Sequence, residues 1–214
     1  MCELRLTRPY EGVYLIEAES QYMITSTFMR LQEYYESPMI DIRKKVFSIE
    51  RYMDRYAEEY GNFTYTTDWN GFNVPGYVVQ AFFNDFSHKN LLKKEKLLKS
   101  LLQDVLKNDK PFYVIGIHKE KSEIEHELAH SFYYLDINYK IAMNDFAMFS
   151  LSKKIRHTIF KELKKMGYDE SVLLDELQAY LATSSFWYLW RKFGFSTAIH
   201  AFTFKKIFEE YKGN

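Results

Sequence analysis

The chain has 214 residues, of which 47% are hydrophobic, and this composition is typical of a folded globular protein. Its 29 basic and 29 acidic residues cancel at pH 7, so no overall field draws the chain to nucleic acid or to an anionic membrane. The single cysteine, Cys2, excludes an intramolecular disulfide bond. We therefore expect one domain over residues 1–214 and no nucleic-acid partner.

Two stretches of the chain bear on its location. The first five residues include charged side chains, and no apolar run of signal-peptide length follows, so we expect a cytoplasmic protein. The most aromatic stretch, residues 186–190, is too short to cross a bilayer and is followed directly by Arg191 and Lys192. We expect no membrane insertion and place this stretch in the core.

Hydrophobic periodicity predicts an α+β fold that is mostly helical with a small β-sheet. The N-terminal half begins with a strand and a helix, and the best strand of the sequence comes just before residue 120. The C-terminal half is nearly all helix. The predicted strands cover residues 12–16 and 112–118, and the predicted helices cover 19–35, 48–60, 78–86, 90–107, 136–149, 152–166 and 171 to about 193.

Residues 62–76 are rich in Gly, Asn, Thr and Pro and are predicted to form the longest irregular stretch. Long loops in compact domains are often functional, although an ordinary packed surface loop is the alternative. Trp69 and Phe72 are the loop residues best able to bury apolar surface of a ligand.

The segment His126-Glu127-Leu128-Ala129-His130 contains an H-E-x-x-H pattern, and the surrounding apolar residues recur at four-residue spacing, which predicts a helix. Histidines one helical turn apart project from the same side and can reach one ion at about 2.0–2.1 Å. Glu127 lies at the edge of the same face, where it can touch a water on the metal rather than the metal itself. The pattern predicts a metal centre.

A catalytic zinc ion typically has three protein ligands and one open position. The extension of the motif that would supply a third histidine is absent, because Tyr133 and Asp136 stand at the places of its Gly and His. The third ligand should therefore be a carboxylate. Glu176 is the best candidate, since it belongs to a predicted helix face without formal charge, where a carboxylate needs a partner such as a metal. The alternatives are Glu162, Glu170 and Asp175.

These residues resemble the gluzincin group of zinc metallopeptidases. The H-E-x-x-H segment matches, and Glu176-Leu177-Gln178-Ala179-Tyr180 is similar to the E-x-x-A-D pattern on the third-ligand helix of several gluzincins. The resemblance implies a zincin-like domain with Zn²⁺ bound by His126, His130 and Glu176, and with Glu127 as the general base. It covers residues 112 to about 185 and none of residues 1–110.

One departure from the family pattern concerns Tyr180, which stands where the family has an Asp that orients a ligand histidine. That orienting role is lost, filled by the Tyr180 hydroxyl or supplied elsewhere. Five residues are candidates for stabilising an oxyanion, and none of them is assigned this role: His157, His200, Tyr133, Tyr134 and Tyr180.

The function expected from this resemblance is zinc-dependent hydrolysis of peptide bonds in a peptide or protein substrate. An exposed edge of the strand at 112–117 could pair with an extended peptide, with the 62–76 loop on the other side of the cleft. A catalytically inactive zincin-like binding or regulatory protein is the first alternative. The second is a helical interaction protein in which the motif is accidental and both histidines lie on the surface.

Overall fold

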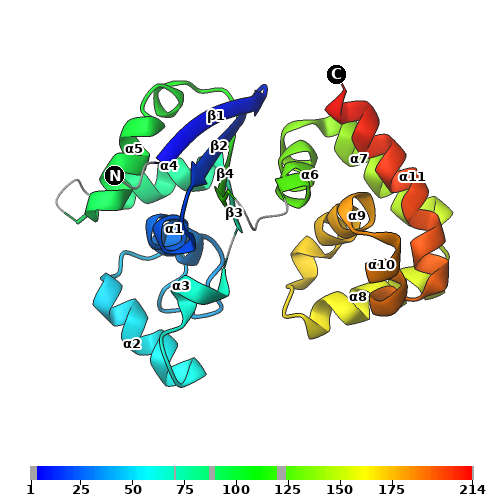
Figure 1. The fold of residues 1–214 in the computed structure, drawn as a ribbon, viewed down its shortest axis with the longest axis horizontal. Helices are drawn as coiled ribbons and strands as arrows, with labels where there is room; N and C mark the ends of the chain where they lie inside the picture. The colour runs from blue at the N-terminus through cyan, green and yellow to red at the C-terminus, as the bar shows by residue number, and fades with distance from the viewer. Residues whose placement is uncertain (1–3, 70, 87–89, 120–123, 214) are drawn as a thin grey trace. The chain divides into compact units, whose positions relative to one another are not determined.

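The computed structural model describes residues 4–69, 71–86, 90–119 and 124–213. The chain forms two compact units, Met1–Ile124 and Glu125–Asn214, and each is described by itself below. The first unit combines a small sheet with helices, whereas the described part of the second unit is all helical (Figure 1). The prediction of an α+β fold that is mostly helical with a small sheet is confirmed. The single domain over residues 1–214 stays a prediction.

The first unit begins with a β-hairpin followed by a helix. Its elements are β1 (Leu4–Tyr10), β2 (Val13–Ala18), α1 (Gln21–Glu36), α2 (Ile49–Tyr60), α3 (Tyr65–Asp68), β3 (Gly71–Pro75), α4 (Gly76–Asp85), α5 (Lys93–Leu101), the short 3₁₀ turn η1 (Val105–Lys107) and β4 (Tyr113–His118). The turn between β1 and β2 contains Gly12 with φ of 77°, a left-handed conformation that glycine adopts without steric cost. The hairpin therefore closes where the sequence supplies a glycine.

The strands form one mixed sheet in the order β1-β2-β4-β3. Strand β2 runs antiparallel to β1 and parallel to β4, and β3 runs antiparallel to β4. Strand β4 is thus central, and all six of its residues are buried. Both of its edges are already paired, so the expectation that an extended peptide binds along residues 112–117 is wrong.

The prediction that residues 62–76 form one long irregular loop is also wrong. Within this stretch, Tyr65–Asp68 form the short helix α3, and Gly71–Pro75 form the edge strand β3, which pairs with β4. Proline is tolerated at the end of an edge strand, because the ladder there needs no donor from it. Phe72 is buried and stacks on Phe28 of α1, with ring centroids 5.4 Å apart, so it is a core residue, whereas Trp69 is exposed.

Helix α1 packs against the sheet through a close approach at Gly116 of β4. A Cβ atom at this position would lie 2.6 Å from the ring of Phe28, so only glycine fits beneath the helix. The surrounding core is dense in aliphatic and aromatic side chains, among them Ile16, Ile24 and Val114. Burial of this apolar surface is the main stabilising term of the first unit.

A buried ion pair links α1 to α5. The Arg30 guanidinium donates to both carboxylate oxygens of Glu95, with Nε–Oε1 at 2.8 Å, and both side chains are nearly inaccessible. Arg30 also donates to the carbonyl oxygens of Phe47 and Asn90, at 2.9 Å each. Glu95 in turn accepts from the Leu92 backbone N–H at 2.7 Å. Each charge is thus satisfied by several partners, as burial of an ion pair requires.

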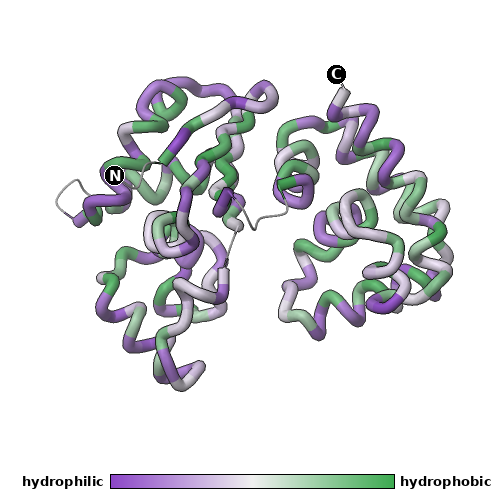
Figure 2. Tube along the Cα trace, viewed as in Figure 1, coloured by the Kyte–Doolittle hydropathy of each residue, from purple (hydrophilic) through white to green (hydrophobic). Residues whose placement is uncertain are grey.

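The second unit is a helical bundle. Its elements are α6 (Ile124–Leu135), α7 (Ile137–Asp145), the π-helical segment η2 (Phe146–Ser150), α8 (Lys153–Lys165), the 3₁₀ turn η3 (Glu170–Val172), α9 (Leu173–Thr183), α10 (Phe186–Phe193) and α11 (Phe195–Lys212). Hydrophobic and hydrophilic bands alternate along these helices (Figure 2). The long helix α11 packs against α7, α9 and α10.

Polar caps divide the bundle into its helices. Asp136 accepts hydrogen bonds from the backbone N–H groups of Asn138 and Tyr139 and so begins α7. Ser185 accepts from the Tyr188 N–H in the same way, and this cap separates α9 from α10. The helix predicted from 171 to about 193 is therefore two helices. The predicted helix at 90–107 is likewise shorter, since α5 ends at Leu101.

The aromatic stretch at 186–190 is not the core segment that we expected. Only Leu189 is buried, and the side chains around it are exposed on α10. Within the described residues, no helix has the length and apolar character needed to cross a membrane.

We predict that Glu95→Ala lowers the free energy of unfolding by about 3–5 kcal/mol, because it leaves the Arg30 charge buried without its partner. Denaturation in urea measures this loss. The matched control is Glu58→Ala, which removes the partner of the exposed Arg55 and should leave the unfolding free energy nearly unchanged. Equal effects of the two substitutions would contradict the role given to the buried pair.

Candidate metal centre

Helix α6 brings the two histidines of the motif together. His126 and His130 lie one turn apart, and their Nε2 atoms are 3.3 Å from each other. Two ligands of one tetrahedral ion with bonds of about 2.0–2.1 Å are separated by roughly 3.3 Å. The two imidazoles therefore have the spacing of neighbouring ligands.

Helix α9 supplies Glu176 to the same point. Its Oε1 lies 3.6 Å from His130 Nε2, and its Oε2 lies 3.8 Å from His126 Nε2. Glu176 is 9% exposed, and its Oε2 is buried without a hydrogen-bond partner in the described part of the chain. A buried carboxylate oxygen without a donor is costly. One ligand atom from each of His126, His130 and Glu176 lies within 4.8 Å of the others, so this donor set fits a metal ion.

Asp175 fixes the orientation of His130. Its Oδ1 accepts from His130 Nδ1 at 2.8 Å, which leaves the lone pair of Nε2 for a cation. Gln178 Nε2 donates to the same Oδ1 at 3.0 Å and to the carbonyl oxygen of Ala129 at 3.3 Å. The Tyr139 hydroxyl then donates to Gln178 Oε1 at 2.8 Å. A chain of hydrogen bonds thus runs from the core of the unit to His130.

His126 has a weaker set of contacts. Its Nδ1 lies 3.5 Å from Thr183 Oγ1, and the Thr183 hydroxyl donates to the carbonyl oxygen of Ala179 at 2.7 Å. Because the Thr183 hydroxyl already donates its proton to Ala179, its oxygen can only accept a hydrogen bond from His126 Nδ1. The Nε2 lone pair of His126 is then available to a cation. The ring of Tyr180 lies edge-on to His126, with centroids 4.8 Å apart.

The charges around His130 favour a cation at this place. Burial alone would lower the pKa of His130, but the carboxylates of Asp175, Glu176 and Glu127 outweigh it and raise the pKa to about 10. The field that stabilises a proton on the imidazole also attracts a metal ion, since both are positive.

Glu127 is half-buried beside the cluster and is not one of its three converging groups. Its negative charge nevertheless acts on His130 and on Tyr168, which places it near both. Glu127 therefore lies close to the cluster, as expected for a residue at the edge of the α6 face that carries the two histidines.

The other candidates for the third ligand are not among the three converging groups. Glu162 accepts a hydrogen bond from Lys165 at 2.7 Å, and Glu170 is exposed and pairs with Lys164 at 3.2 Å. Asp175 is present at the centre but bonds His130 Nδ1 rather than converging with the Nε2 atoms. Only Glu176 joins both histidines.

The candidates for oxyanion stabilisation differ in position. The Tyr133 hydroxyl donates to Asn144 at 2.7 Å, and His157 is exposed on α8. Tyr180 lies next to His126 and shares a hydrogen bond of 3.2 Å with Tyr168. Burial, followed by the charge of Glu176, raises the pKa of Tyr168, so its phenol stays protonated.

Sequence reasoning missed Asp175 as a positioning residue, and it missed Tyr168 entirely. Asp175 could have been considered for this role, because it immediately precedes the predicted ligand Glu176. The gluzincin pattern instead has its orienting Asp at the place of residue 180. Tyr168 lies in a connection between α8 and η3, where no helical periodicity could indicate which way the side chain points.

No protein-family model, curated protein or solved structure matches this chain.

We predict that Tyr139→Phe lowers the free energy of unfolding by about 1–3 kcal/mol, because it leaves the buried Gln178 Oε1 without a donor. The control is Tyr211→Phe, since the Tyr211 ring packs against Tyr139 and its hydroxyl forms no hydrogen bond in the residues described. Urea denaturation compares the two variants. A larger loss for Tyr211→Phe would contradict the network.

Proposed function

We propose that this chain is a zinc-dependent peptidase with a zincin-like domain, in which His126, His130 and Glu176 hold Zn²⁺ and Glu127 is the general base. The observation that carries the proposal is the convergence of two imidazole Nε2 atoms on a buried carboxylate whose Oε2 has no hydrogen-bond partner in the residues described. Two histidines and one glutamate are a ligand set of catalytic zinc, which keeps a fourth position open.

The chemistry needs a strong nucleophile at neutral pH. When bound, Zn²⁺ supplies it by lowering the pKa of a coordinated water towards about 7 and by polarising the scissile carbonyl. Glu127 accepts the proton of the attacking water and later donates it to the leaving amine. His130 is held in the required tautomer by its 2.8 Å bond to Asp175, so this imidazole does not have to reorient, whereas His126 has the longer contact of 3.5 Å with Thr183.

The position of Asp175 bears on the departure from the gluzincin pattern at Tyr180. In this chain the carboxylate that orients a histidine comes from the residue before Glu176, and it acts on His130. We propose that Asp175 takes the orienting role, while the Tyr180 ring packs on His126. The missing Asp at position 180 is then no obstacle to zinc binding.

The substrate class is a peptide or protein. Pairing of a peptide with β4 is not part of the proposal, because both edges of that strand are occupied. A specific hydrogen-bond donor for the oxyanion is likewise left out of the proposal.

Two alternatives differ in what they require. An inactive zincin-like binding or regulatory protein would keep the metal ligands and lack turnover. A helical interaction protein with an accidental motif would have both histidines at the surface, but His130 is only 4% exposed and is bonded to Asp175. The burial of His130 therefore favours the first alternative over the second.

We predict about one zinc ion per chain in protein purified without an affinity tag, measured by atomic emission. His126→Ala, His130→Ala and Glu176→Gln should lose the ion, because each removes one of three ligands. Glu127→Gln should keep it. The control for Glu176→Gln is Glu170→Gln, which removes an exposed carboxylate outside the cluster and should retain the metal.

Within the same series, Asp175→Asn should bind zinc about 10–100-fold more weakly, because residues that orient a ligand histidine affect affinity to this extent. Titration against a chelating competitor gives the affinity. Unchanged affinity in Asp175→Asn would remove its orienting role. Loss of zinc in Glu170→Gln but not in Glu176→Gln would move the third ligand elsewhere.

We predict that the zinc-loaded chain cleaves members of a peptide library and that Glu127→Gln, although still loaded, loses at least about 100-fold in kcat/KM. Mass spectrometry of the library detects the products. Cleavage by Glu127→Gln at the wild-type rate would contradict its role as the base. A loaded wild-type protein without turnover would favour the inactive binding protein.

A further inference from the structure

The start of α10 exposes an unusual number of large aromatic side chains. Trp187 is 65% exposed and Trp190 is 43% exposed, and Phe186 beside them is also open to solvent. Single exposed apolar residues are ordinary, but a contiguous group of them marks a surface that binds something.

The exposed aromatic rings touch one another. Trp187 lies 5.3 Å from Trp190 and 5.6 Å from Phe186, measured between ring centroids, and Trp190 lies 5.8 Å from Phe195 of α11. The surface continues along α11 through Ile199, which is exposed, and Phe202, which is 76% exposed. Phe195, Ile199 and Phe202 recur at helical spacing and share one face. We call these residues the aromatic patch: Phe186, Trp187, Trp190, Phe195, Ile199 and Phe202.

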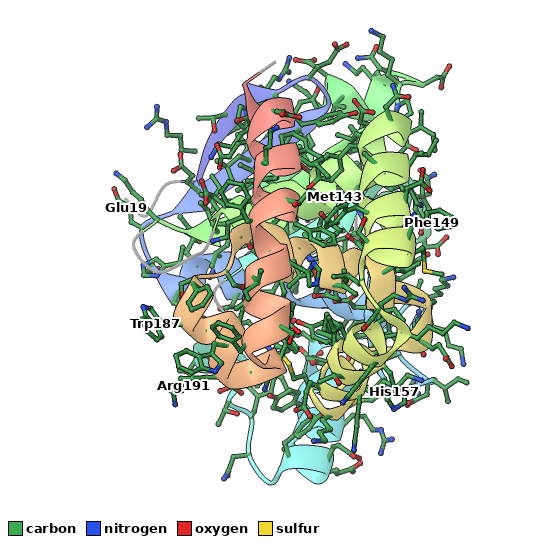
Figure 3. All side chains as sticks on the ribbon, turned by 90° about the vertical axis from the view of Figure 1, so that its right-hand side faces the viewer. Glu19, Met143, Phe149, His157, Trp187 and Arg191 are labelled. Carbon is green, nitrogen blue, oxygen red and sulfur yellow. The ribbon has the colours of Figure 1, made fainter. Side chains whose placement is uncertain are left out.

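The segment of sequence that carries the aromatic patch has charges of one sign. From residue 177 to residue 208 the sequence contains no Asp or Glu, and it contains Arg191, Lys192, Lys205 and Lys206. Arg191 follows Trp187 by one turn, and both side chains project outward from α10 (Figure 3). Lys206 follows Phe202 by one turn on α11 and has only a long, exposed contact with Glu210, at 3.8 Å.

Lys192 is placed differently. The pKa of Glu162 on α8 is lowered, mainly by its hydrogen bond from Lys165 and in smaller part by the charges of Lys165 and Lys192. Lys192 therefore faces α8, whereas Arg191 and Lys206, each one helical turn after a residue of the aromatic patch, border it.

We propose that the aromatic patch docks this chain on an anionic membrane surface, with the aromatic rings at the level of the lipid headgroups and Arg191 and Lys206 against their phosphates. Tryptophan and phenylalanine bordered by basic residues are the composition of segments that lie in the membrane interface. The docked helices lie on the bilayer, so this inference needs no helix that crosses it. It is independent of the proposed peptidase function.

A second copy of the chain fits the aromatic patch less well. A twofold dimer built on it would bring Arg191 and Lys206 of one copy close to the same cations of the other, with no acidic residue in 177–208 to offset the repulsion. Anionic headgroups supply the opposite charge and an apolar layer together.

The test is co-sedimentation of the full chain, as purified, with vesicles of phosphatidylcholine alone, or of equal parts phosphatidylcholine and phosphatidylglycerol. We expect binding to the anionic vesicles that weakens as salt is raised. Tryptophan emission should shift to the blue on binding in a Trp69→Phe background, where only the patch tryptophans report. No binding to anionic vesicles would overturn the proposal.

Matched variants separate the aromatic patch from general surface charge. Trp187→Ser with Trp190→Ser, and separately Arg191→Gln with Lys206→Gln, should each weaken binding by about tenfold or more. The controls are Phe149→Ser, which removes an exposed ring outside the patch, and Lys153→Gln with Lys154→Gln, which removes the same charge from α8. Circular dichroism checks that every variant is folded.

Equal weakening by the patch variants and their controls would overturn the proposal. Analytical ultracentrifugation without vesicles provides a second criterion. A dimer that the tryptophan variants dissociate would also overturn it, since the aromatic patch would then be an interface between copies of the chain.

Discussion

Negative charge concentrated at the start of α9 is the constraint on which the candidate site depends. Asp175 and Glu176 are consecutive, lie in the first turn of the helix and face the histidines of α6. A helix N-terminus stabilises carboxylates, but both of these are also held close to a buried imidazole. With Glu127 they form a group of like charges, which a proton on His130 or a bound metal ion would offset. The charges of Asp175, Glu176 and Glu127 also raise the pKa of His130.

The rest of the second unit holds this group in place. Gln178 and Tyr139 restrain Asp175 from the side of the core, and Asp136 begins the helix that carries Tyr139. The α11 end is tied to α6 by Lys212, which donates to Glu125 at 2.7 Å. The first unit reaches stability by other means, through an aromatic core and the Arg30–Glu95 pair. The candidate metal centre and the sheet are therefore built from separate parts of the sequence.

Much of the site could be predicted from the sequence, because its geometry is local. The spacing of His126 and His130 within one helix fixes their relation, and the uncharged neighbours of Glu176 indicate a packed face. The link from Asp175 to His130 could not be predicted in this way. It depends on how α9 packs against α6, because the angle between these helices decides which histidine nitrogen each of the two consecutive carboxylates reaches.

The errors in the fold have physical reasons. Strand β4 is apolar at nearly every position, which is typical of a central strand, and this should have argued against an exposed edge. Residues 71–75 carry Gly, Asn and Pro, and those residues favour a loop by propensity while pairing with β4 makes them a strand. The aromatic run at 186–190 is apolar enough for a core. Composition does not show which face of a helix the neighbouring elements cover. In α10 the buried residues are Leu189 and Phe193.

The most direct measurement of the central claim is an anomalous difference map from a crystal of the zinc-loaded chain, recorded at the zinc absorption edge. The account predicts one peak about 2.0–2.2 Å from His126 Nε2, His130 Nε2 and a carboxylate oxygen of Glu176. Asp175 should remain bonded to His130 Nδ1, outside the coordination sphere. A zinc peak bound to other residues, with the three side chains unliganded, would contradict it.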